Sequence, residues 1–355
     1  MADEDIAGKI RDALGTITVP GGTSLADFPG LSDIIVTKGA VAFAISVAPG
    51  MEAAFAPART AAEQAAKAAA DGRKVMVSLT GDKAPAQAAP GRRPGPPPKT
   101  PVPGIRHIVA VGSGKGGVGK STCAVNIALG LAQQGLRTGI LDADLYGPSL
   151  PKLLGIEGKP AIRDDRIFKP FDVFGLKAMS IGPMLTDSQA VVWRGPMATS
   201  ALRQLLRETA WGELDVLVVD LPPGTGDIQI SLVQQVELTG AVIVSTPQDM
   251  ALIDARKAVD MFRRTKVDVL GLIENMSFFV APDTGKRYDI FGHGGARAAA
   301  DDLDIPFLGE IPLVMAIREG ADAGRPAVAA APDGPEASAF LAIARQLAET
   351  ISSRR

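Results

Sequence analysis

Runs of consecutive apolar residues recur along the C-terminal two thirds of the chain, with longer amphipathic stretches between them. Strands that are apolar at successive positions are buried on both faces, which is typical of a parallel sheet covered by helices. A helix is expected at Ser121–Gln134, directly after the first run, and helical segments separate most of the others. The pattern predicts an α/β unit with a mainly parallel sheet, whose strands are expected at residues 105–111, 138–141, 215–220, 241–245, 267–273 and 306–311.

The N-terminal part shows a different pattern, with short strands and an alanine-rich helix. Helices are expected at Asp5–Leu14 and Met51–Ala70, and a hairpin turn at Lys38-Gly39 joins the first two of three strands, at residues 33–37, 41–47 and 73–79. An α-β-β-α-β order makes a small two-layer domain. We therefore expect a separate α+β domain before the larger unit.

Dense proline separates these two parts. The stretch APAQAAPGRRPGPPPKTPVPG cannot continue a helix or a central strand, because proline lacks a backbone N–H. Such a segment favours the extended polyproline II conformation and acts as a spacer. The sequence thus predicts a small α+β domain at residues 1–83, a linker at 84–104 and a larger α/β domain at 105–355.

Composition narrows the classes of function. Of the 355 residues, 46% are hydrophobic, enough to bury a large core, and the net charge of −2 argues against a general nucleic-acid binder. The single cysteine, Cys123, excludes a disulfide within the chain and a cysteine-only metal site built from one protomer. No apolar run is long enough to span a membrane, and the acidic start lacks a signal-peptide pattern. We expect a cytoplasmic protein that binds neither nucleic acid nor membrane.

The strand expected at 105–111 leads directly into a glycine-rich loop and then a helix. Gly114–Ser121 fits G-x-x-x-x-G-K-[ST], the pattern of a phosphate-binding P-loop. Glycines let backbone N–H groups converge on phosphates, and the following helix presents its positive end to the same anions. Lys120 would reach the outer phosphates, and the Ser121 hydroxyl would ligate Mg²⁺. The expected nucleotide-binding residues here are Gly114, Lys115, Gly116, Gly117, Val118, Gly119, Lys120, Ser121 and Thr122.

Acidic residues end two of the expected strands. Asp142 and Asp144 follow the strand at 138–141, at the edge where parallel sheets bind ligands. Asp220 ends an apolar strand in the Walker B pattern and would hold Mg²⁺ through water. A capping or turn role stays open for one of Asp142 and Asp144.

From residue 105 to about residue 328, the chain resembles the Mrp family of P-loop ATPases, the iron–sulfur cluster carriers. The resemblance rests on the strings GSGKGGVGKS, LDADLYGPSLP, WRGPM, DLPPGTGD, STPQDMALIDARKA, ENMSFF, RYDIFGHGGA and IREGADAGRP. The N-terminal domain resembles, more weakly, the one that precedes the ATPase in many members. The resemblance implies an Mg²⁺-dependent ATPase that acts as a nucleotide-bridged homodimer and serves iron–sulfur client or scaffold proteins.

The resemblance also implies catalytic roles. Lys115, the extra lysine of a deviant P-loop, would cross the dimer interface to the partner's nucleotide and neutralise charge in the transferring phosphoryl group, as an arginine finger does. Together with Lys120 it would form the catalytic set, in which Asp144 orients the attacking water. Asp142 would lie near the Mg²⁺ hydration shell, alongside Asp220.

Three further nucleotide contacts come from the resemblance. The N–H of Gly224, in the string that resembles switch II, would meet the γ-phosphate. Asn275 would read the adenine edge, a task that suits an amide because it carries both a donor and an acceptor. Pro312 would flank the base from a neighbouring strand end.

One departure concerns the cargo. Many members carry Cys-x-x-Cys where this chain has Ala281 and Thr284, and neither residue can supply a thiolate to a 4Fe–4S cluster. Cys123 follows the P-loop closely and is expected to be a buried packing residue. His293, in a glycine-rich turn, is expected to be structural. A cluster therefore stays possible by resemblance, with its usual ligands absent.

Two other functions stay open. The chain could be a positioning ATPase of the MinD/ParA type, or an ATP-dependent metallochaperone or switch without iron–sulfur cargo. MinD-like proteins usually end in a basic amphipathic helix. Here the last helix has few cations, and its apolar residues at helical spacing favour packing over membrane anchoring: Phe340, Ile343, Leu347 and Ile351.

Overall fold

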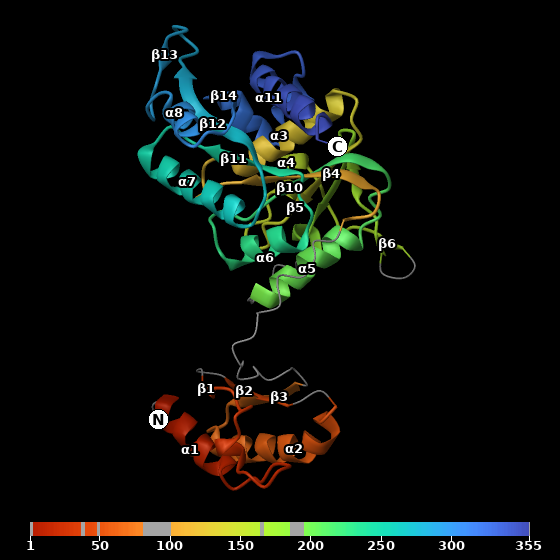
Figure 1. Ribbon diagram of the computed structural model, residues 1–355, viewed down its shortest axis with the longest axis vertical. Helices are drawn as coiled ribbons and strands as arrows, with labels where there is room; N and C mark the ends of the chain where they lie inside the picture. Colours follow the sequence, from red (N-terminus) through yellow and green to blue (C-terminus); the bar gives the residue numbers. More distant parts are fainter. Residues whose placement is uncertain are drawn as a thin grey trace. The chain divides into compact units, whose positions relative to one another are not determined.

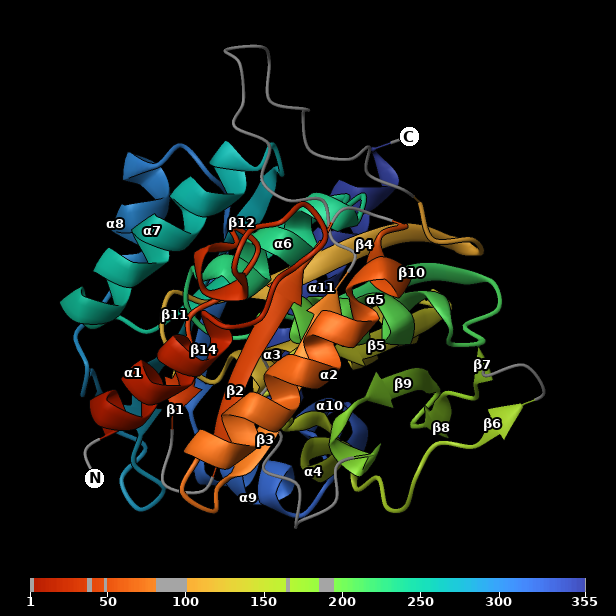
Figure 2. The same cartoon turned by 90° about the horizontal axis from the view of Figure 1, so that it is seen from below.

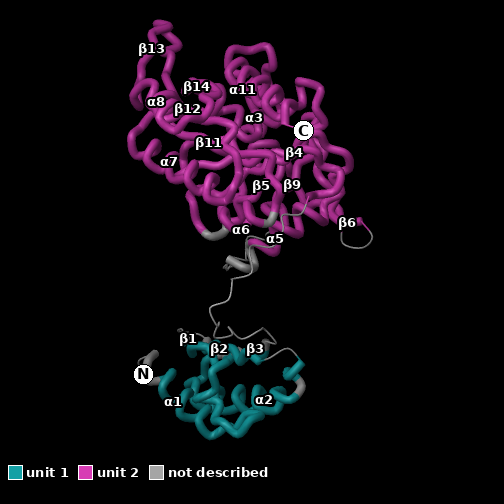
Figure 3. Tube along the Cα trace, viewed as in Figure 1, with its two compact units in different colours: residues 1–94 teal, residues 95–355 magenta. Residues whose placement is uncertain are grey.

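The computed structural model describes residues 3–36, 40–47, 50–80, 101–163, 167–184 and 195–354. The chain divides into two compact units, Met1–Pro94 and Gly95–Arg355 (Figure 3). Most of the expected linker, residues 84–104, and the turn at Lys38-Gly39 fall outside the described residues. The domain limits read from the sequence therefore stay a prediction.

The N-terminal unit is a small two-layer α+β arrangement. Helices α1 and α2 lie against a short sheet in which β2 pairs antiparallel with β1 and parallel with β3 (Figure 2). Its core combines apolar residues four apart on α1, such as Ile6 and Ile10, with small residues on α2, such as Ala62 and Ala66. The elements are α1 (Asp3–Leu14), the 3-10 turn η1 (Leu25–Asp27), β1 (Ile35–Val36), β2 (Ala40–Ser46), α2 (Glu52–Ala69) and β3 (Lys74–Thr80).

A nine-stranded, mainly parallel sheet forms the centre of the second unit, as the apolar runs predict. Its order is β13-β12-β11-β4-β10-β5-β9-β8, with β14 also paired to β12; within the described ranges, β8 and β13 pair antiparallel and the other strands pair in parallel. The strands are β4 (Ile105–Gly112), β5 (Thr138–Asp142), β8 (Phe171–Val173), β9 (Leu176–Ser180), β10 (Leu214–Asp220), β11 (Gly240–Ser245), β12 (Val269–Val280), β13 (Arg287–Tyr288) and β14 (Phe307–Leu313); β6 (Ile162–Arg163) and β7 (Ile167–Phe168) form a separate hairpin.

Helices cover both faces of this sheet, which explains why its strands are apolar at successive positions (Figure 1). One face carries α3 (Lys120–Gln133), α4 (Leu150–Leu154), α10 (Ala327–Ala330) and α11 (Pro335–Ser352). The other carries α5 (Gly195–Arg207), α6 (Asp227–Gln235), α7 (Asp249–Arg264) and α8 (Gly295–Asp302). The short turn η3 (Gly182–Met184) follows β9, and α9 (Met315–Asp322) follows β14.

The last helix, α11, is a packing helix, as its sequence pattern predicts. Its four apolar positions are each at most 1% exposed and belong to the core that also contains α3: Phe340, Ile343, Leu347 and Ile351. No helix within the described part of the chain is long and apolar enough to cross a lipid bilayer.

The sheet register brings the functional ends of the strands together. β10 pairs in parallel with β4 on one side and with β5 on the other, so Asp220 lies opposite Val111 and Asp142. The carboxyl ends of parallel strands meet at one edge. The P-loop and the two aspartates that end β5 and β10 therefore share that edge.

Asp215, at the opposite end of β10, ties this strand to the start of β5. Its carboxylate accepts hydrogen bonds from Arg137 Nε at 3.0 Å, from the guanidinium at 2.9 Å and from the Arg137 backbone N–H at 2.9 Å. These bonds hold the pKa of Asp215 well below its usual range. A depressed folded-state pKa contributes stability above the unfolded pKa of about 3.9 and loses it as the pH falls through the folded value.

We predict that Asp215→Asn lowers the free energy of unfolding by about 1 kcal/mol at pH 6, because it removes a partly exposed charge-assisted pair. The difference from wild type should shrink as the pH approaches 3. Urea unfolding at both pH values measures this, with Asp172→Asn as the control, since the Asp172 side chain is 67% exposed. An Asp215→Asn deficit that stays constant down to pH 3 would contradict the linkage.

Candidate nucleotide-binding site

The P-loop connects the end of β4 to the start of α3. Gly117 and Gly119 have φ values of 82° and 78°, in the left-handed region that favours glycine. Gly119 is the N-cap of α3 and, as a glycine, has no side chain that could cap the N–H groups of the helix's first turn. Uncapped N–H groups at a helix N-terminus form a site for anions. The loop geometry therefore suits phosphate binding.

Two neighbouring elements press closely on this loop. A Cβ atom at Gly114 would lie 2.6 Å from the Cβ of Asp254 on α7 and would overlap the Asp254 carbonyl group. A Cβ atom at Gly119 would overlap the Asn275 amide. Nδ2 of Asn275 donates to the Val118 carbonyl at 2.8 Å. Glycine is thus required at both positions, and Asn275 joins β12 directly to the P-loop.

Lys120 and Asp220 form a buried ion pair at the centre of the site. Lys120 Nζ lies 2.5 Å from Asp220 Oδ1 and 3.3 Å from Ser121 Oγ. The two side chains are only 6% and 1% exposed. Burial raises the pKa of Asp220, and the Lys120 ammonium opposes this shift. The P-loop lysine is therefore paired with the Walker B aspartate at the centre of the site.

The oxygen atoms beside this pair fit a magnesium ion. Oδ2 of Asp220 is buried and has no hydrogen-bond partner within the described residues. The Ser121 hydroxyl, which contacts the same lysine, is a second oxygen donor. Mg²⁺ prefers oxygen ligands and keeps several of its waters. The donor set expected from the sequence at Ser121 and Asp220 is therefore chemically suitable for this ion.

Asp142 organises the loop that follows β5. Its Oδ1 accepts from the Asp144 N–H at 3.0 Å, and its Oδ2 accepts from the Leu150 N–H and the Ser180 hydroxyl, both at 3.1 Å. Burial, and then the charge of Asp220, raises the pKa of Asp142 to about 7. With these bonds Asp142 stabilises the turn at Asp144 and caps the first N–H of α4, a role that the sequence analysis left open for one of the two aspartates. A place near the Mg²⁺ hydration shell stays a prediction.

Asp144 is half-buried, and its Oδ1 accepts from the Gly147 N–H at 3.2 Å. This bond helps close the loop that Asp142 begins. The negative charge of Asp144 is one of the causes that raise the pKa of Asp220, so the two carboxylates interact. Its role in orienting water stays a prediction.

Lys115, within the P-loop, and Gly224, beside it, differ in their hydrogen-bond partners. Lys115 is half-buried, and the structure gives its ammonium group no hydrogen-bond or ion-pair partner among the described residues. Gly224, at φ 94°, donates its N–H to the Ser113 carbonyl at 3.0 Å. A contact between this N–H and a phosphate would therefore require release from Ser113.

The remaining expected residues lie around the same loop. Thr122 is half-buried in the first turn of α3, and its carbonyl accepts from Asn126 Nδ2 at 2.9 Å. Pro312 is half-buried in β14, next to Ile311, which lies opposite Asn275 in the β12–β14 register. Asn275, within β12, and Pro312, in β14, thus lie near each other on adjacent strands, and the Asn275 amide is bonded to the P-loop backbone. Their expected contacts to a base stay a prediction.

Sequence reasoning missed Glu274 and Ser180. Glu274 is fully buried and accepts from the Ser277 hydroxyl at 2.6 Å and from the Ala296 N–H, at the start of α8, at 2.7 Å. Its position directly after the apolar run that ends at Ile273 is the feature of the sequence that could have marked it as a candidate. Ser180 ends β9, a strand whose short sequence, LKAMS, carries no clear apolar run.

The residues at the Cys-x-x-Cys position form the turn between β12 and β13. Ala281 is 9% exposed and Thr284 is exposed; the Ala281 carbonyl accepts from the Gly285 N–H at 2.8 Å. His293 is exposed, with its Nδ1 2.8 Å from the guanidinium of Arg287. No group of three or more metal-binding side chains occurs among the described residues.

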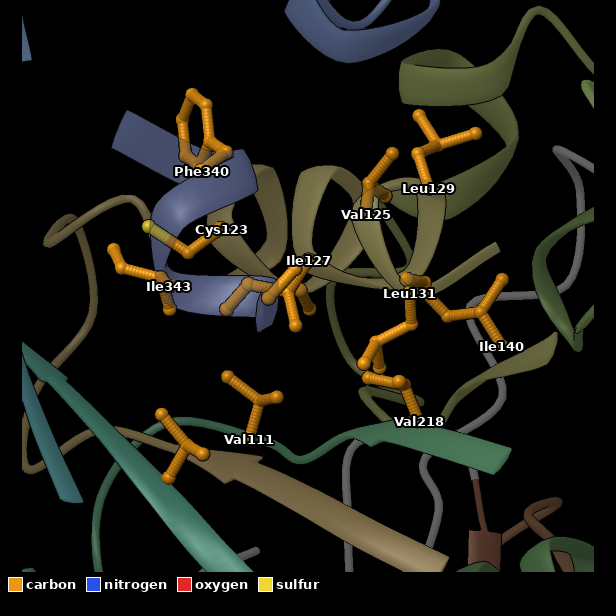
Figure 4. Close-up of a cluster of buried hydrophobic side chains, with 14 of the residues drawn as sticks. Val111, Cys123, Val125, Ile127, Leu129, Leu131, Ile140, Val218, Phe340 and Ile343 are labelled. Atoms are coloured by element: carbon orange, nitrogen blue, oxygen red, sulfur yellow. The ribbon is translucent and has the colours of Figure 1, made fainter. Parts of the chain in front are cut away.

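Cys123 is a core residue, as expected. It is fully buried in the cluster between α3 and α11, where Figure 4 draws it with Phe340 and Ile343. Burial raises the pKa of its thiol far above the usual range. A buried, protonated thiol is neither a metal ligand nor a nucleophile.

Residues 104–348, more than half of the chain, match the family model described as NUBPL iron-transfer P-loop NTPase. The chain belongs to this family. A second family model, described as iron-sulfur cluster assembly protein, matches residues 8–79 of the NTPase. The P-loop NTPase class predicted from the sequence is confirmed.

Individual relatives agree with this family. The iron-sulfur cluster carrier protein of Deinococcus radiodurans is 56% identical over 254 residues, which cover 71% of the NTPase and 72% of that relative. The structure of a nucleotide-binding protein from Archaeoglobus fulgidus in complex with ADP is 41% identical and covers 67% of the NTPase and 92% of that chain, with a TM-score of 0.58. The cell division ATPase MinD of Pyrococcus furiosus, at 22% identity, a TM-score of 0.54 and coverage of 69% and 99%, shares the fold.

We predict that Gly114→Ala destabilises the nucleotide-free NTPase by about 2 kcal/mol, because the added Cβ forces α7 away from the P-loop. Gly116→Ala is the matched control. A Cβ at Gly116 would lie 3.9 Å from Pro223, in ordinary contact, so the change should stay within about 0.5 kcal/mol. Chemical denaturation without nucleotide measures both, and equal stability of the two variants would refute the close packing of α7.

Proposed function

We propose that this NTPase is an ATP-binding and ATP-hydrolysing iron–sulfur cluster carrier or assembly factor that acts as a nucleotide-bridged homodimer. The observation that carries the proposal is the buried Lys120–Asp220 pair, in which Asp220 Oδ2 has no hydrogen-bond partner in the described part of the chain and the Ser121 hydroxyl contacts Lys120. This arrangement supports binding of a phosphate chain with its magnesium ion. The cargo is supported by the 56% identity to an iron-sulfur cluster carrier protein.

Hydrolysis is assigned to residues around the P-loop. A bound nucleotide would draw the Lys120 ammonium from Asp220 to its outer phosphates, since these carry more negative charge. Mg²⁺ held by Ser121 and Asp220 would withdraw charge from the phosphoryl group. Asp144 would orient the attacking water, and the Gly224 N–H would exchange the Ser113 carbonyl for the γ-phosphate.

The homodimer rests on Lys115. Its ammonium lacks a partner among the residues described here, although it lies half-buried in a loop that binds phosphate. A cation in this position can stabilise transferring charge on a nucleotide held by a second copy. Two copies related by a twofold axis would each supply one lysine to the other's site.

The cargo needs ligands from outside this chain. A 4Fe–4S cluster normally takes four cysteine thiolates, and Ala281, Thr284 and the buried Cys123 supply none. We propose that a client or scaffold protein, or a small thiol, completes the cluster site. The same observation favours a second candidate, an ATP-dependent metallochaperone or switch without iron–sulfur cargo.

A positioning function of the MinD type has less support. The likeness to MinD, at 22% identity, concerns the fold, and the apolar face of α11 is buried in the core. The proposal therefore involves no membrane and no nucleic acid. A cytoplasmic location belongs to it, with the single cysteine as its support.

We predict that Lys120→Ala abolishes productive ATP binding, because it removes the cation that faces the outer phosphates. Lys115→Ala should leave ATP binding largely intact and lower turnover by about a thousandfold, since its charge acts on the partner's nucleotide. Calorimetric ATP binding and phosphate release measure the two effects. Wild-type turnover in the Lys115→Ala protein would refute the proposed action across the dimer.

A second prediction concerns cargo. The unmodified protein should retain little cluster after anaerobic reconstitution and gel filtration, and the double variant Ala281→Cys/Thr284→Cys should retain more, because it restores two thiolates per protomer. Iron and sulfide counts per dimer provide the measurement. A stable, stoichiometric cluster in the unmodified protein that survives Cys123→Ser would contradict the prediction.

A further inference from the structure

The loop between β10 and α6, residues 221–226, has an unusual shortage of backbone donors. It is called the switch II loop here. Its Leu221 N–H donates to the Val111 carbonyl at 3.0 Å, and its Gly224 N–H donates to the Ser113 carbonyl at 3.0 Å. Between them stand Pro222 and Pro223, which have no N–H. The middle of this loop can therefore be held by backbone hydrogen bonds only where the carbonyl oxygen of Pro222 or Pro223 accepts from a donor outside the loop.

Gln229 supplies that outside side chain. It lies in the first turn of α6, is 2% exposed, and its Nε2 donates a hydrogen bond to the Pro222 carbonyl. Its Oε1 is buried and has no hydrogen-bond partner within the described residues. A buried unpaired amide oxygen is unfavourable, and an apolar side chain of the same size would avoid it. Packing alone therefore does not account for a glutamine here.

The bond acts on a segment that lies beside the P-loop. Gly224 is bonded to Ser113, the residue before the loop, and a Cβ added at Gly116 would come within 3.9 Å of Pro223. Because two successive prolines restrict the backbone, fixing the carbonyl of Pro222 also fixes where Pro223 and Gly224 lie.

We propose that Gln229 is a positioning residue for ATP hydrolysis: its amide holds the Pro222 carbonyl, which keeps the switch II loop beside the P-loop while the Gly224 N–H exchanges the Ser113 carbonyl for a phosphate. The residue acts through the loop and does not itself touch nucleotide. This inference rests on the hydrolytic function proposed above. It attributes the fixed conformation of the switch II loop to the single hydrogen bond between Gln229 Nε2 and the Pro222 carbonyl.

Two substitutions separate positioning from a structural role. Gln229→Leu removes both the donor and the unpartnered oxygen, and Gln229→Met does the same while keeping the unbranched length of the side chain. Gln234→Leu, the same change on a half-buried residue of the same helix, is the control. The measurements are steady-state ATP hydrolysis, ADP affinity, thermal unfolding and amide hydrogen exchange of Gly224.

Both Gln229 variants should lower kcat by about tenfold with ADP affinity within about twofold, since only the order of the loop changes. Gln229→Leu should unfold at an unchanged or higher temperature and exchange the Gly224 amide faster than wild type. The control should match wild type in all four measurements. Loss of kcat only in parallel with lost stability and ADP affinity would overturn the positioning role, as would unchanged kcat in both variants.

The outcome also separates this inference from the proposed function. If the unmodified protein hydrolyses no ATP, the proposed function fails, and the loop contact is then judged by hydrogen exchange alone. Faster exchange of Gly224 in Gln229→Leu, and not in Gln234→Leu, would support the contact. Equal exchange in both variants would overturn it.

Discussion

The buried ion pair between Lys120 and Asp220 is the interaction on which the site depends. Removing either partner would leave one charge buried without compensation, which is among the most unfavourable changes a protein can undergo. The pair exists because β10 runs between β4 and β5, so that Asp220 ends beside the P-loop. Among the described residues, Asp220 Oδ2 has no hydrogen-bond partner. The nucleotide-free site is therefore arranged around a cation that can be redirected to phosphate.

The sequence predicts much of the fold because strands buried on both faces leave an unmistakable apolar pattern. All six expected strands of the large sheet occur, and so does the P-loop helix. The sequence did not predict β9, because LKAMS is short and mixes apolar and polar residues. For the same reason it did not predict that Ser180, at the end of β9, donates to Asp142. The hydrogen bonds of Asp142, Glu274 and Gln229 link distant segments, and no local pattern encodes such links.

The chain separates nucleotide chemistry from cluster chemistry. The residues around the P-loop require only carboxylate, hydroxyl, ammonium and backbone groups, all of which are present. The turn between β12 and β13 carries Ala281 and Thr284, which have no thiol and therefore cannot supply a thiolate ligand to a cluster. Asn275 joins this same strand to the P-loop, so the two regions remain mechanically connected through β12.

The most direct test of this account is a crystal structure of the protein with magnesium and a non-hydrolysable ATP analogue. The account predicts that Lys120 Nζ leaves Asp220 for a phosphate oxygen and that the Gly224 N–H leaves the Ser113 carbonyl. A bound nucleotide with Lys120 still on Asp220 and Gly224 still on Ser113 would contradict it, because the ion pair would then be a structural feature unrelated to phosphate binding.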